Sequence, residues 1–437
     1  AKDIDALLDQ VTEAQEKWAD APMDLRASVL LRIAAILRDR SQDLGALATE
    51  EMGKPITESI AEVEKCAWVC EYYAEASPRL LTEEQVAASA SLSLVRYEPL
   101  GIVLAIMPWN FPFWQVFRFI APTVMAGNAA VLKHSPNVTG VSLAIEQLLV
   151  DAGLPEGVFR SLVIAESAVP DVVGQLIQDD RIAAVALTGS NRAGASVAMS
   201  AGRATKKSVL ELGGSDSFVV LPDADLDVVV PKAVASRFLN AGQSCLCAKR
   251  FIIHKSIVRE FGRRFAAAVS DLVVGLPNEA TTNIGPLARP DLVATLERQV
   301  NQSIGAGAVV LTGGQRLGRG PAWYAPTVLV NVTTDMPVMA EETFGPVAAV
   351  IAFDSDQEAI ELANASPYGL GASVWSSDVE HAMDIGRRID SGILSINAVT
   401  ASDPRLPFGG VKQIGYGREL GGAGAREFTN IRTVVVA

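Results

Sequence analysis

Cysteine and histidine are scarce in this sequence, which contains four cysteines and three histidines among 437 residues. So few cysteines exclude a small fold held together by a disulfide framework. Cys66 and Cys70 lie four residues apart in a helical pattern, and with so few histidines they give little support to a zinc site. We therefore expect no bound metal and predict that both cysteines are buried in a helix.

Long basic or apolar runs are also missing. The 37 lysines and arginines are outnumbered by 50 acidic residues, and no basic run offers the surface that a nucleic acid backbone needs. Prolines and polar residues interrupt the most apolar region, 101–132, so no run reaches the roughly 18 residues of a membrane span. The start of the chain is an acidic amphipathic pattern and not a signal peptide. We expect a cytoplasmic protein that binds neither nucleic acid nor membrane.

The pattern of strands and helices predicts an α/β protein. Hydrophobic residues make up 49% of the chain, which suits strands buried on both faces, and the chain exceeds the roughly 250–300 residues at which single cores stop growing. Buried strands alternate with helical segments, as in a doubly wound parallel sheet, at 101–107, 129–133, 158–164 and 182–187. A second series of strands begins near residue 215, so we predict two domains.

The usual dinucleotide fingerprint, G-x-G-x-x-G after a first strand, is absent in that context. Instead, the strand at 182–187 runs into Thr188-Gly189-Ser190, where glycine lets a pyrophosphate approach the N–H groups of the next helix. Lys133 ends another buried strand, at the sheet edge where ligands of such folds bind. An ordinary turn and a solvated lysine are the simpler alternatives, and the residues alone leave them open.

A candidate nucleophile lies in the stretch 240–250, which reads NAGQSCLCAKR. Gly242 and Ser244 leave space around Cys245, as a reactive thiol needs. Cys247 shares the side-chain face of Cys245 only if the stretch is extended, because two residues apart on a helix point in different directions. Either cysteine is therefore a candidate on the local sequence alone.

Two further residues are candidate helpers. Glu211 stands where an apolar strand meets two glycines, and partial desolvation there raises a carboxyl pKa toward that of a general base. A strand-end glutamate in water is the alternative. Asn110 stands between two prolines in PWNFP, where its amide can donate to an oxyanion or simply hold a loop.

Seven motifs follow one another along nearly the whole chain: PWNFP (108–112), Lys133, TGS (188–190), ELGG (211–214), GQSC (242–245), EETFGPV (341–347) and PFGGVKQIGYGRE (407–419). Together they resemble the aldehyde dehydrogenase superfamily. The resemblance implies two Rossmann-like doubly wound domains plus a small β oligomerisation element. The expected parts are a dinucleotide-binding domain at 1–214 with a strand excursion near 82–100, a catalytic domain at 215–407, and a return segment with an oligomerisation strand at 408–437.

The resemblance implies Cys245, not Cys247, as the nucleophile that attacks an aldehyde. Asn110 and the Cys245 N–H would hold the oxyanion, hydride would pass to a nicotinamide, and Glu211 would activate the water that releases the acid. The cofactor-binding residues implied in the same way are Trp109, Lys133, Ser135, Gly189, Ser190, Glu342 and Phe344.

Pro136 stands three residues after Lys133, where many NAD-preferring family members carry a glutamate that repels a 2′-phosphate. Without that barrier, Ser135 and His134 could contact the phosphate, so we expect either NAD or NADP to bind. Family members also usually have a preceding N-terminal strand, so we expect the N-terminus of this chain to be truncated or disordered.

Arg118 follows Asn110 by eight residues in an apolar helix start, where a guanidinium needs an anionic partner. It matches an arginine with which succinate semialdehyde dehydrogenases hold the distal carboxylate of the substrate, and Ser402 matches their carboxylate-binding serine. Their second arginine is replaced by Leu239, for which Arg405 could compensate. The apolar wall of the substrate pocket would be formed by Phe111, Trp114 and Phe408.

Several alternatives stay open. An internal ion pair of Arg118 would favour a dehydrogenase for other short, apolar or aromatic aldehydes. A non-catalytic binding protein on the same fold and a thiol hydrolase are disfavoured by the joint presence of the nucleophile and cofactor motifs.

Two hypotheses concern regulation and assembly. The Cys245-x-Cys247 pair recurs in some succinate semialdehyde dehydrogenases as a disulfide, so we hypothesise reversible oxidative inactivation that requires an extended stretch. The terminal strand TVVVA has no obvious partner nearby. Together with an exposed strand at 91–97, it suggests sheet extension across a homodimer or homotetramer.

Overall fold

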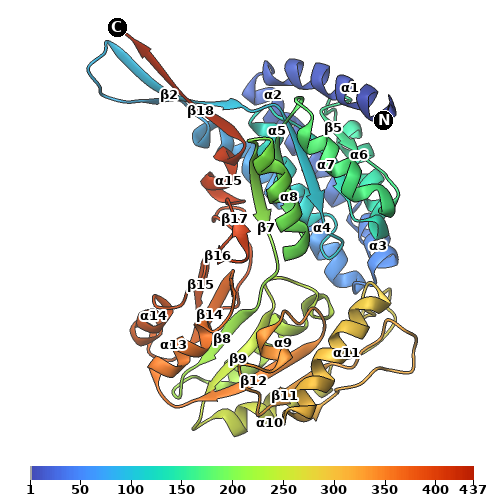
Figure 1. The fold of residues 1–437 in the computed structure, drawn as a ribbon, viewed down its shortest axis with the longest axis vertical. Coiled ribbons are helices and arrows are strands. Elements are labelled where there is room, and N and C mark those ends of the chain that lie inside the picture. The colour runs from blue at the N-terminus through green and yellow to red at the C-terminus, as the bar shows by residue number, and fades with distance from the viewer. Residues whose placement is uncertain (1) are drawn as a thin grey trace.

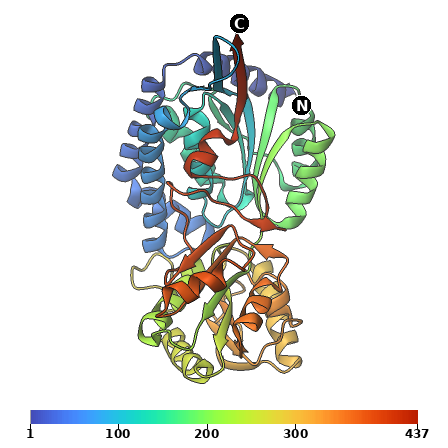
Figure 2. The same cartoon turned by 90° about the vertical axis from the view of Figure 1, so that its left-hand side faces the viewer.

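The computed structural model describes residues 2–437, and Ala1, the first residue of the expected cofactor domain, lies outside them. The chain forms two lobes, each built on its own sheet, and a narrow arm of strands that projects from the first lobe (Figures 1 and 2). The helices of the first lobe are α1 (Lys2–Ala19), α2 (Met23–Asp39), α3 (Ser41–Met52), α4 (Ile56–Leu80), α5 (Trp114–Met125), α6 (Thr139–Asp151), α7 (Val169–Gln178), α8 (Asn191–Arg203) and α15 (Gly421–Glu427). Those of the second lobe are α9 (Leu226–Phe238), α10 (Val258–Ser270), α11 (Pro290–Gly305), α12 (Pro337–Ala340), α13 (Asp356–Asn364) and α14 (Val379–Gly386).

The first sheet has the order β17-β7-β6-β3-β4-β5 and is parallel except at β17. Its strands are β3 (Ile102–Met107), β4 (Ala129–His134), β5 (Phe159–Ser161), β6 (Ile182–Thr188), β7 (Lys207–Glu211) and β17 (Gly415–Tyr416). The chain adds β4 and β5 on one side of β3, then β6 and β7 on the other. Ligands of such sheets bind at the carboxyl ends of the strands where this direction reverses, here β3 and β6.

The second sheet has the order β10-β11-β12-β9-β8-β14-β15 and is parallel except at β10. Its strands are β8 (Asp216–Val220), β9 (Ala248–His254), β10 (Val309–Thr312), β11 (Thr327–Val330), β12 (Val347–Phe353), β14 (Gly371–Trp375) and β15 (Ile393–Ile396). A separate pair joins β13 (Tyr368–Gly369) to β16 (Val411–Lys412). The two doubly wound sheets confirm the predicted α/β class, and the division of the chain near residues 214 and 407 remains our proposal.

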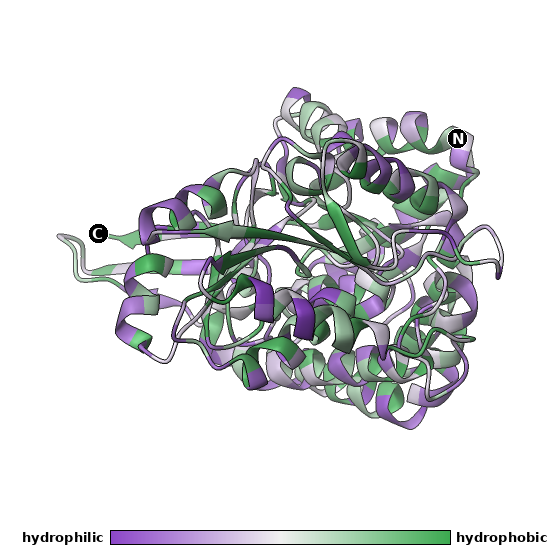
Figure 3. Cartoon of the chain, turned by 90° about the horizontal axis from the view of Figure 1, so that it is seen from below, coloured by the Kyte–Doolittle hydropathy of each residue, from purple (hydrophilic) through white to green (hydrophobic). Residues whose placement is uncertain are grey.

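The core lies on both faces of each sheet. Every residue of β4 is buried, and so are all residues of α5, which is therefore an internal helix. Figure 3 shows hydrophobic residues concentrated in the central strands. Cys66 and Cys70 are buried in α4, as predicted. No helix in the described part of the chain is long and apolar enough to cross a membrane.

The arm is an antiparallel sheet with the order β1-β2-β18. Its strands are β1 (Glu84–Gln85), β2 (Leu92–Pro99) and β18 (Thr429–Val436). The expectation that the terminal strand lacks a partner in its own chain was wrong, because the chain turns back after α15 and β18 pairs with β2 over its full length. The outer edge of β18 pairs with no strand among residues 2–437, and Ile431 and Val435 on this strand are exposed.

Candidate active site

Two cavities meet at Cys245. The substrate-side cavity, of about 410 Å³, is lined by the predicted substrate residues Phe111, Trp114, Arg118, Ser402 and Phe408. The cofactor-side cavity, of about 270 Å³, lies at the carboxyl ends of β3 and β6 and is lined by Trp109, Asn110, Gly189, Ser190, Glu342 and Phe344. Cys245 lines both cavities, so this residue stands between the two predicted ligands.

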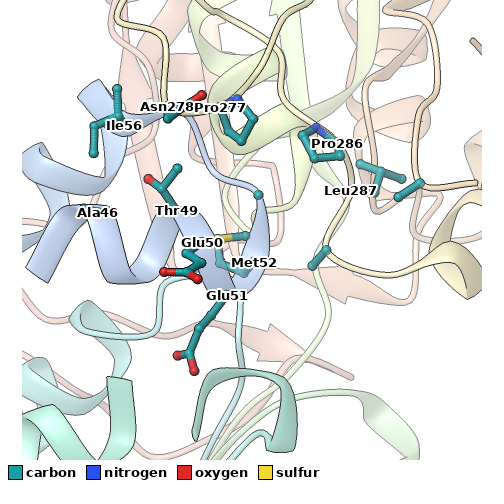
Figure 4. A pocket seen from close by; sticks show the side chains of 13 residues that line it. Ala46, Thr49, Glu50, Glu51, Met52, Ile56, Pro277, Asn278, Pro286 and Leu287 are labelled. Atoms are coloured by element: carbon teal, nitrogen blue, oxygen red, sulfur yellow. The ribbon is translucent and has the colours of Figure 1, made fainter. Parts of the chain in front are cut away.

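A third cavity, of about 540 Å³, lies between the end of α3 and the segment 277–288 (Figure 4). Of its two carboxylates, Glu51 accepts hydrogen bonds from the Gly140 and Val141 N–H groups, at 2.7 and 2.9 Å. None of the site residues predicted from the sequence lines it. The candidate active site is therefore the pair of cavities that share Cys245.

The loop that carries Cys245 follows α9 through three consecutive left-handed residues, 240–242, with φ of 52°, 51° and 76°. A left-handed conformation costs on the order of 1–2 kcal/mol for a residue with a side chain, so contacts must hold this loop. Asn240 Nδ2 donates to the Asn110 carbonyl oxygen at 2.7 Å. Gly242 has no room for a side chain, because a Cβ there would collide with the Gly345 carbonyl oxygen.

A buried guanidinium joins this loop to the segment that carries the cofactor residues. Arg237 is fully buried and makes no salt bridge to any of residues 2–437. It donates instead to the carbonyl oxygens of Gly242 at 3.4 Å, Thr343 at 3.0 Å and Val347 at 2.5 Å, and also to that of Gly345. Glu342 and Phe344 flank these acceptors, so Arg237 fixes their segment relative to the Cys245 loop.

Two N–H donors lie beside Cys245. Asn110 is 4% exposed, and its Nδ2 donates to the Gln243 carbonyl oxygen at 3.1 Å, which holds the amide against the loop. The second Nδ2 hydrogen of Asn110 and the Cys245 N–H have no acceptor within residues 2–437. Together these donors can stabilise an oxyanion that forms when Cys245 attacks a carbonyl.

Burial controls the protonation of the site. It raises the pKa of the Cys245 thiol to about 12, and the cations of Arg118 and Lys249 oppose this only in part. Glu211, at the end of β7, is buried as predicted, and burial beside Glu419 raises its pKa as well. Glu211 lines neither cavity, so its side chain must rotate to reach a water beside Cys245.

Arg118 is not a free cation. It is 2% exposed, its Nε lies 2.5 Å from Glu419 Oε2, and its guanidinium carbon lies 4.6 Å from the centre of the Phe408 ring. This is the internal ion pair that the sequence left open as the alternative to a substrate carboxylate. Arg405 does not compensate for the missing second arginine, because it pairs with Asp403 and does not line the cavity.

Ser402 does line the substrate-side cavity, but its partner was not predicted. Its hydroxyl accepts a hydrogen bond from Lys65 Nζ at 2.7 Å. On α4, Lys65 follows Glu62 by three residues, Ala61 by four and Glu58 by seven, and all four residues line the cavity. The spacing was readable in the sequence, but only tertiary packing shows that this face meets the site.

Cys247 is buried and lines the substrate-side cavity as well. The stretch is not extended: the Cys247 N–H donates to the Ser244 carbonyl oxygen at 3.4 Å, which closes a turn. A disulfide between Cys245 and Cys247 therefore requires this turn to open.

The cofactor-side cavity suits a dinucleotide. Ser190 caps the N-terminus of α8, where its side chain accepts from the Ala193 N–H at 3.3 Å, and the positive end of the helix dipole favours a pyrophosphate there. Glu342 accepts from the Gly214 N–H at 2.9 Å. Phe344 packs edge-on against Trp109, with ring centres 5.7 Å apart. These residues fit NAD(P)+.

Lys133, Ser135 and Pro136 line a separate small hollow at the end of β4. The expected phosphate contact of His134 is not supported, because its ring nitrogens lie 3.2 Å from the Met107 and 2.9 Å from the Pro112 carbonyl oxygens. Burial lowers its pKa to about 4, so the ring is neutral. Within residues 2–437, no carboxylate lines this hollow.

The fold and site define a class of proteins, the oxidoreductases that pair a dinucleotide cleft with a cysteine nucleophile. Residues 1–434 match the aldehyde dehydrogenase family, and the chain belongs to that family. It is 48% identical to the probable succinate-semialdehyde dehydrogenase (NADP+) of Synechocystis sp., over 100% of this chain and 95% of that protein. It is 46% identical to the succinate semialdehyde dehydrogenase (NAD(P)+) Sad of Escherichia coli, over 99% of this chain and 93% of that protein.

Solved structures agree with this membership. The structure of succinic semialdehyde dehydrogenase from Streptococcus pyogenes, in complex with NADP+, aligns with a TM-score of 0.96 at 35% identity. The alignment covers 99% of this chain and 94% of that chain. The fold prediction is therefore confirmed, while the roles of individual residues remain proposals.

We predict that Asn110→Ala lowers kcat by about 100- to 1000-fold, because it removes one oxyanion donor. Steady-state kinetics measures this loss, and the exposed Asn301→Ala on α11 serves as the control. An unchanged kcat in Asn110→Ala, with the protein still folded, would contradict the assignment.

We also predict that Cys245 alkylation by iodoacetamide accelerates steadily from pH 7 to pH 10 in the cofactor-free protein. The reason is that burial raises the pKa of this thiol to about 12, so the thiolate fraction grows throughout that range. Mass spectrometry of the Cys245 peptide follows the reaction, with Cys245→Ser as the control. A rate that levels off below pH 8 would show that the thiolate forms near neutrality.

Proposed function

We propose that this protein oxidises succinate semialdehyde to succinate with NAD(P)+. The observation that carries the proposal is the position of Cys245, which lines both the substrate-side and the cofactor-side cavity. The full-length relatives from Synechocystis sp. and Escherichia coli carry the names of succinate semialdehyde dehydrogenases, and this supports the choice of substrate.

In the proposed reaction, the Cys245 thiol loses its proton to solvent water, and its sulfur bonds to the aldehyde carbon while the C=O π electrons move to the oxygen. The resulting oxyanion accepts hydrogen bonds from Asn110 Nδ2 and the Cys245 N–H. The C–H bond of this carbon then breaks and leaves a thioester on Cys245; NAD(P)+, when bound, would accept the hydride. Glu211 then takes a proton from water, which attacks the thioester on Cys245 and releases the acid.

The raised pKa values of Cys245 and Glu211 suit their proposed roles as nucleophile and general base. The half-buried Cys245 thiol, with its raised pKa, stays protonated at neutral pH, which protects it from unspecific reactions. The raised pKa of Glu211 makes it a stronger base once it is ionised. Glu342, Phe344 and Trp109 would orient the nicotinamide end of the cofactor, and Gly189 and Ser190 the pyrophosphate.

Both NAD+ and NADP+ fit the proposal. Pro136 brings no carboxylate to the hollow that Lys133 and Ser135 also line. Lys133 offers a cation to a 2′-phosphate, and Ser135 offers a hydroxyl.

A second candidate function is the oxidation of apolar or aromatic aldehydes. The ion pair between Arg118 and Glu419 favours it, because the charge of this arginine is already matched inside the protein. The apolar wall of Phe111, Trp114 and Phe408 would accept such substrates equally well.

We also propose a homodimer or homotetramer assembled through the arm. The free edge of β18 can pair with another strand, and the exposed Ile431 and Val435 on this strand would gain burial.

We predict that kcat/KM for succinate semialdehyde exceeds that for butyraldehyde by about tenfold or more, because a buried charge-assisted contact to the carboxylate is worth that much. Butyraldehyde has a similar chain without the carboxylate, so it is the matched control. Initial rates of NADH and NADPH formation measure both. Equal kcat/KM values for the two aldehydes would contradict this substrate choice and support the second candidate function, the oxidation of apolar or aromatic aldehydes.

We predict that Pro136→Glu lowers kcat/KM for NADP+ by about tenfold or more while NAD+ is still used, because a carboxylate there repels the 2′-phosphate. Parallel titrations of the two cofactors measure the ratio, and Pro136→Gln controls for side-chain size. If NADP+ use survives in Pro136→Glu, the 2′-phosphate is bound elsewhere.

A further inference from the structure

The substrate-side cavity contains two cations in different electrostatic states. Arg118 is matched by Glu419. Lys65 makes no salt bridge with any of residues 2–437, although it is half-buried. A buried charge without a counter-charge is unfavourable, so this end of the cavity is suited to an anion.

The contacts of Lys65 hold its ammonium at the cavity wall. Its Nζ donates to Ser402 Oγ at 2.7 Å and lies 4.4 Å from the centre of the Trp114 ring. The ring fixes the ammonium through a cation–π contact that leaves N–H donors unused. The same cavity reaches Cys245, so an aldehyde with an anionic tail could contact both groups.

Neither of the two carboxylates on the same face of α4 forms a salt bridge with Lys65, although Glu62 attracts it. Glu62 pairs with Lys54 and accepts from two backbone N–H groups at the start of α5, both at 2.8 Å. Glu58 accepts from the Asn240 N–H at 2.7 Å, and burial raises its pKa to about 7. Both carboxylates therefore have their own partners.

The other charged or titratable neighbours of Lys65 come from three elements. Cys66, next to it on α4, is a buried thiol; Asp403, in the loop after Ser402, pairs with Arg405; and Arg118 on α5 repels it. Burial lowers the pKa of Lys65 to about 8. Lys65 is therefore a cation at neutral pH and loses its charge in mildly alkaline solution.

We propose that Lys65 and Ser402 bind the distal carboxylate of the substrate and set its specificity, while Arg118 remains paired with Glu419. The assignment rests on the proposed oxidation of succinate semialdehyde. Lys65 has three N–H donors and gives one to Ser402, which leaves donors for one carboxylate oxygen. The Ser402 hydroxyl can accept from Lys65 and donate its own hydrogen to the other oxygen.

The test is a set of three variants assayed with succinate semialdehyde and butyraldehyde. We expect Lys65→Met to raise KM for succinate semialdehyde by about 10- to 100-fold, since it removes a charged hydrogen-bond donor, and to leave KM for butyraldehyde within about twofold. Lys65→Arg should keep most of the preference. The exposed Lys232→Met on α9 is the matched control and should change neither value.

The outcomes separate this inference from the proposed function. If wild type does not prefer succinate semialdehyde, the proposed function fails. If wild type prefers it and folded Lys65→Met keeps the full preference, the Lys65 assignment fails and the function stands. If Lys65→Met raises KM for both aldehydes by the same factor, Lys65 only supports the cavity wall, and the assignment is also overturned.

A pH series on wild type gives an independent readout if Lys65→Met does not fold. KM for succinate semialdehyde should rise relative to KM for butyraldehyde as pH rises through about 8, because Lys65 then loses its proton. Titration of Cys245 and Glu211 affects both aldehydes and cancels in this ratio. Glu58 also lines the cavity and has a pKa of about 7, so the series is repeated in Glu58→Gln, where the change near pH 8 should remain. A ratio that is constant from pH 6.5 to pH 9.5 would overturn the assignment.

Discussion

The site depends on one buried cation, Arg237, which is stabilised by hydrogen bonds to carbonyl oxygens and forms no salt bridge within residues 2–437. Its hydrogen bonds join the left-handed turn before Cys245 to the segment that carries Glu342 and Phe344. Desolvating a guanidinium is costly, so every one of these acceptors must stay in place. The same contacts hold the two cavities together around one thiol, although the nucleophile and the cofactor residues are about a hundred positions apart in the sequence.

Charge matching explains how an apolar cavity can still select an anionic substrate. Arg118, Lys54 and Arg237 each have internal partners, and their burial is compensated within the protein. Lys65 has a hydroxyl and an aromatic ring but no carboxylate. A substrate carboxylate would form an ion pair with the Lys65 ammonium and so provide the negative charge that this cation lacks.

Much of the fold could be predicted from the sequence, because local patterns encode it. Buried strands followed by glycines mark the sheet edge that binds ligands, and motif order predicts Cys245 and Asn110, which line the cofactor-side cavity, and Glu211, which is buried outside both cavities. The partners of Arg118 and β18 could not be predicted, since each lies more than 300 residues away along the chain. Lys65 was missed for the same reason: helical spacing defines a face, and only packing shows what that face meets.

The central claim, that Cys245 carries the substrate between the two cavities, is tested most directly by trapping the acyl-enzyme. Glu211→Gln, in which hydrolysis is slowed, is mixed with succinate semialdehyde and NADP+, quenched in acid and digested for fragmentation mass spectrometry. The account predicts a succinyl group on Cys245 that requires the cofactor and is absent from Cys247. A succinyl group on Cys247, or none on either cysteine while NADPH still forms, would contradict it.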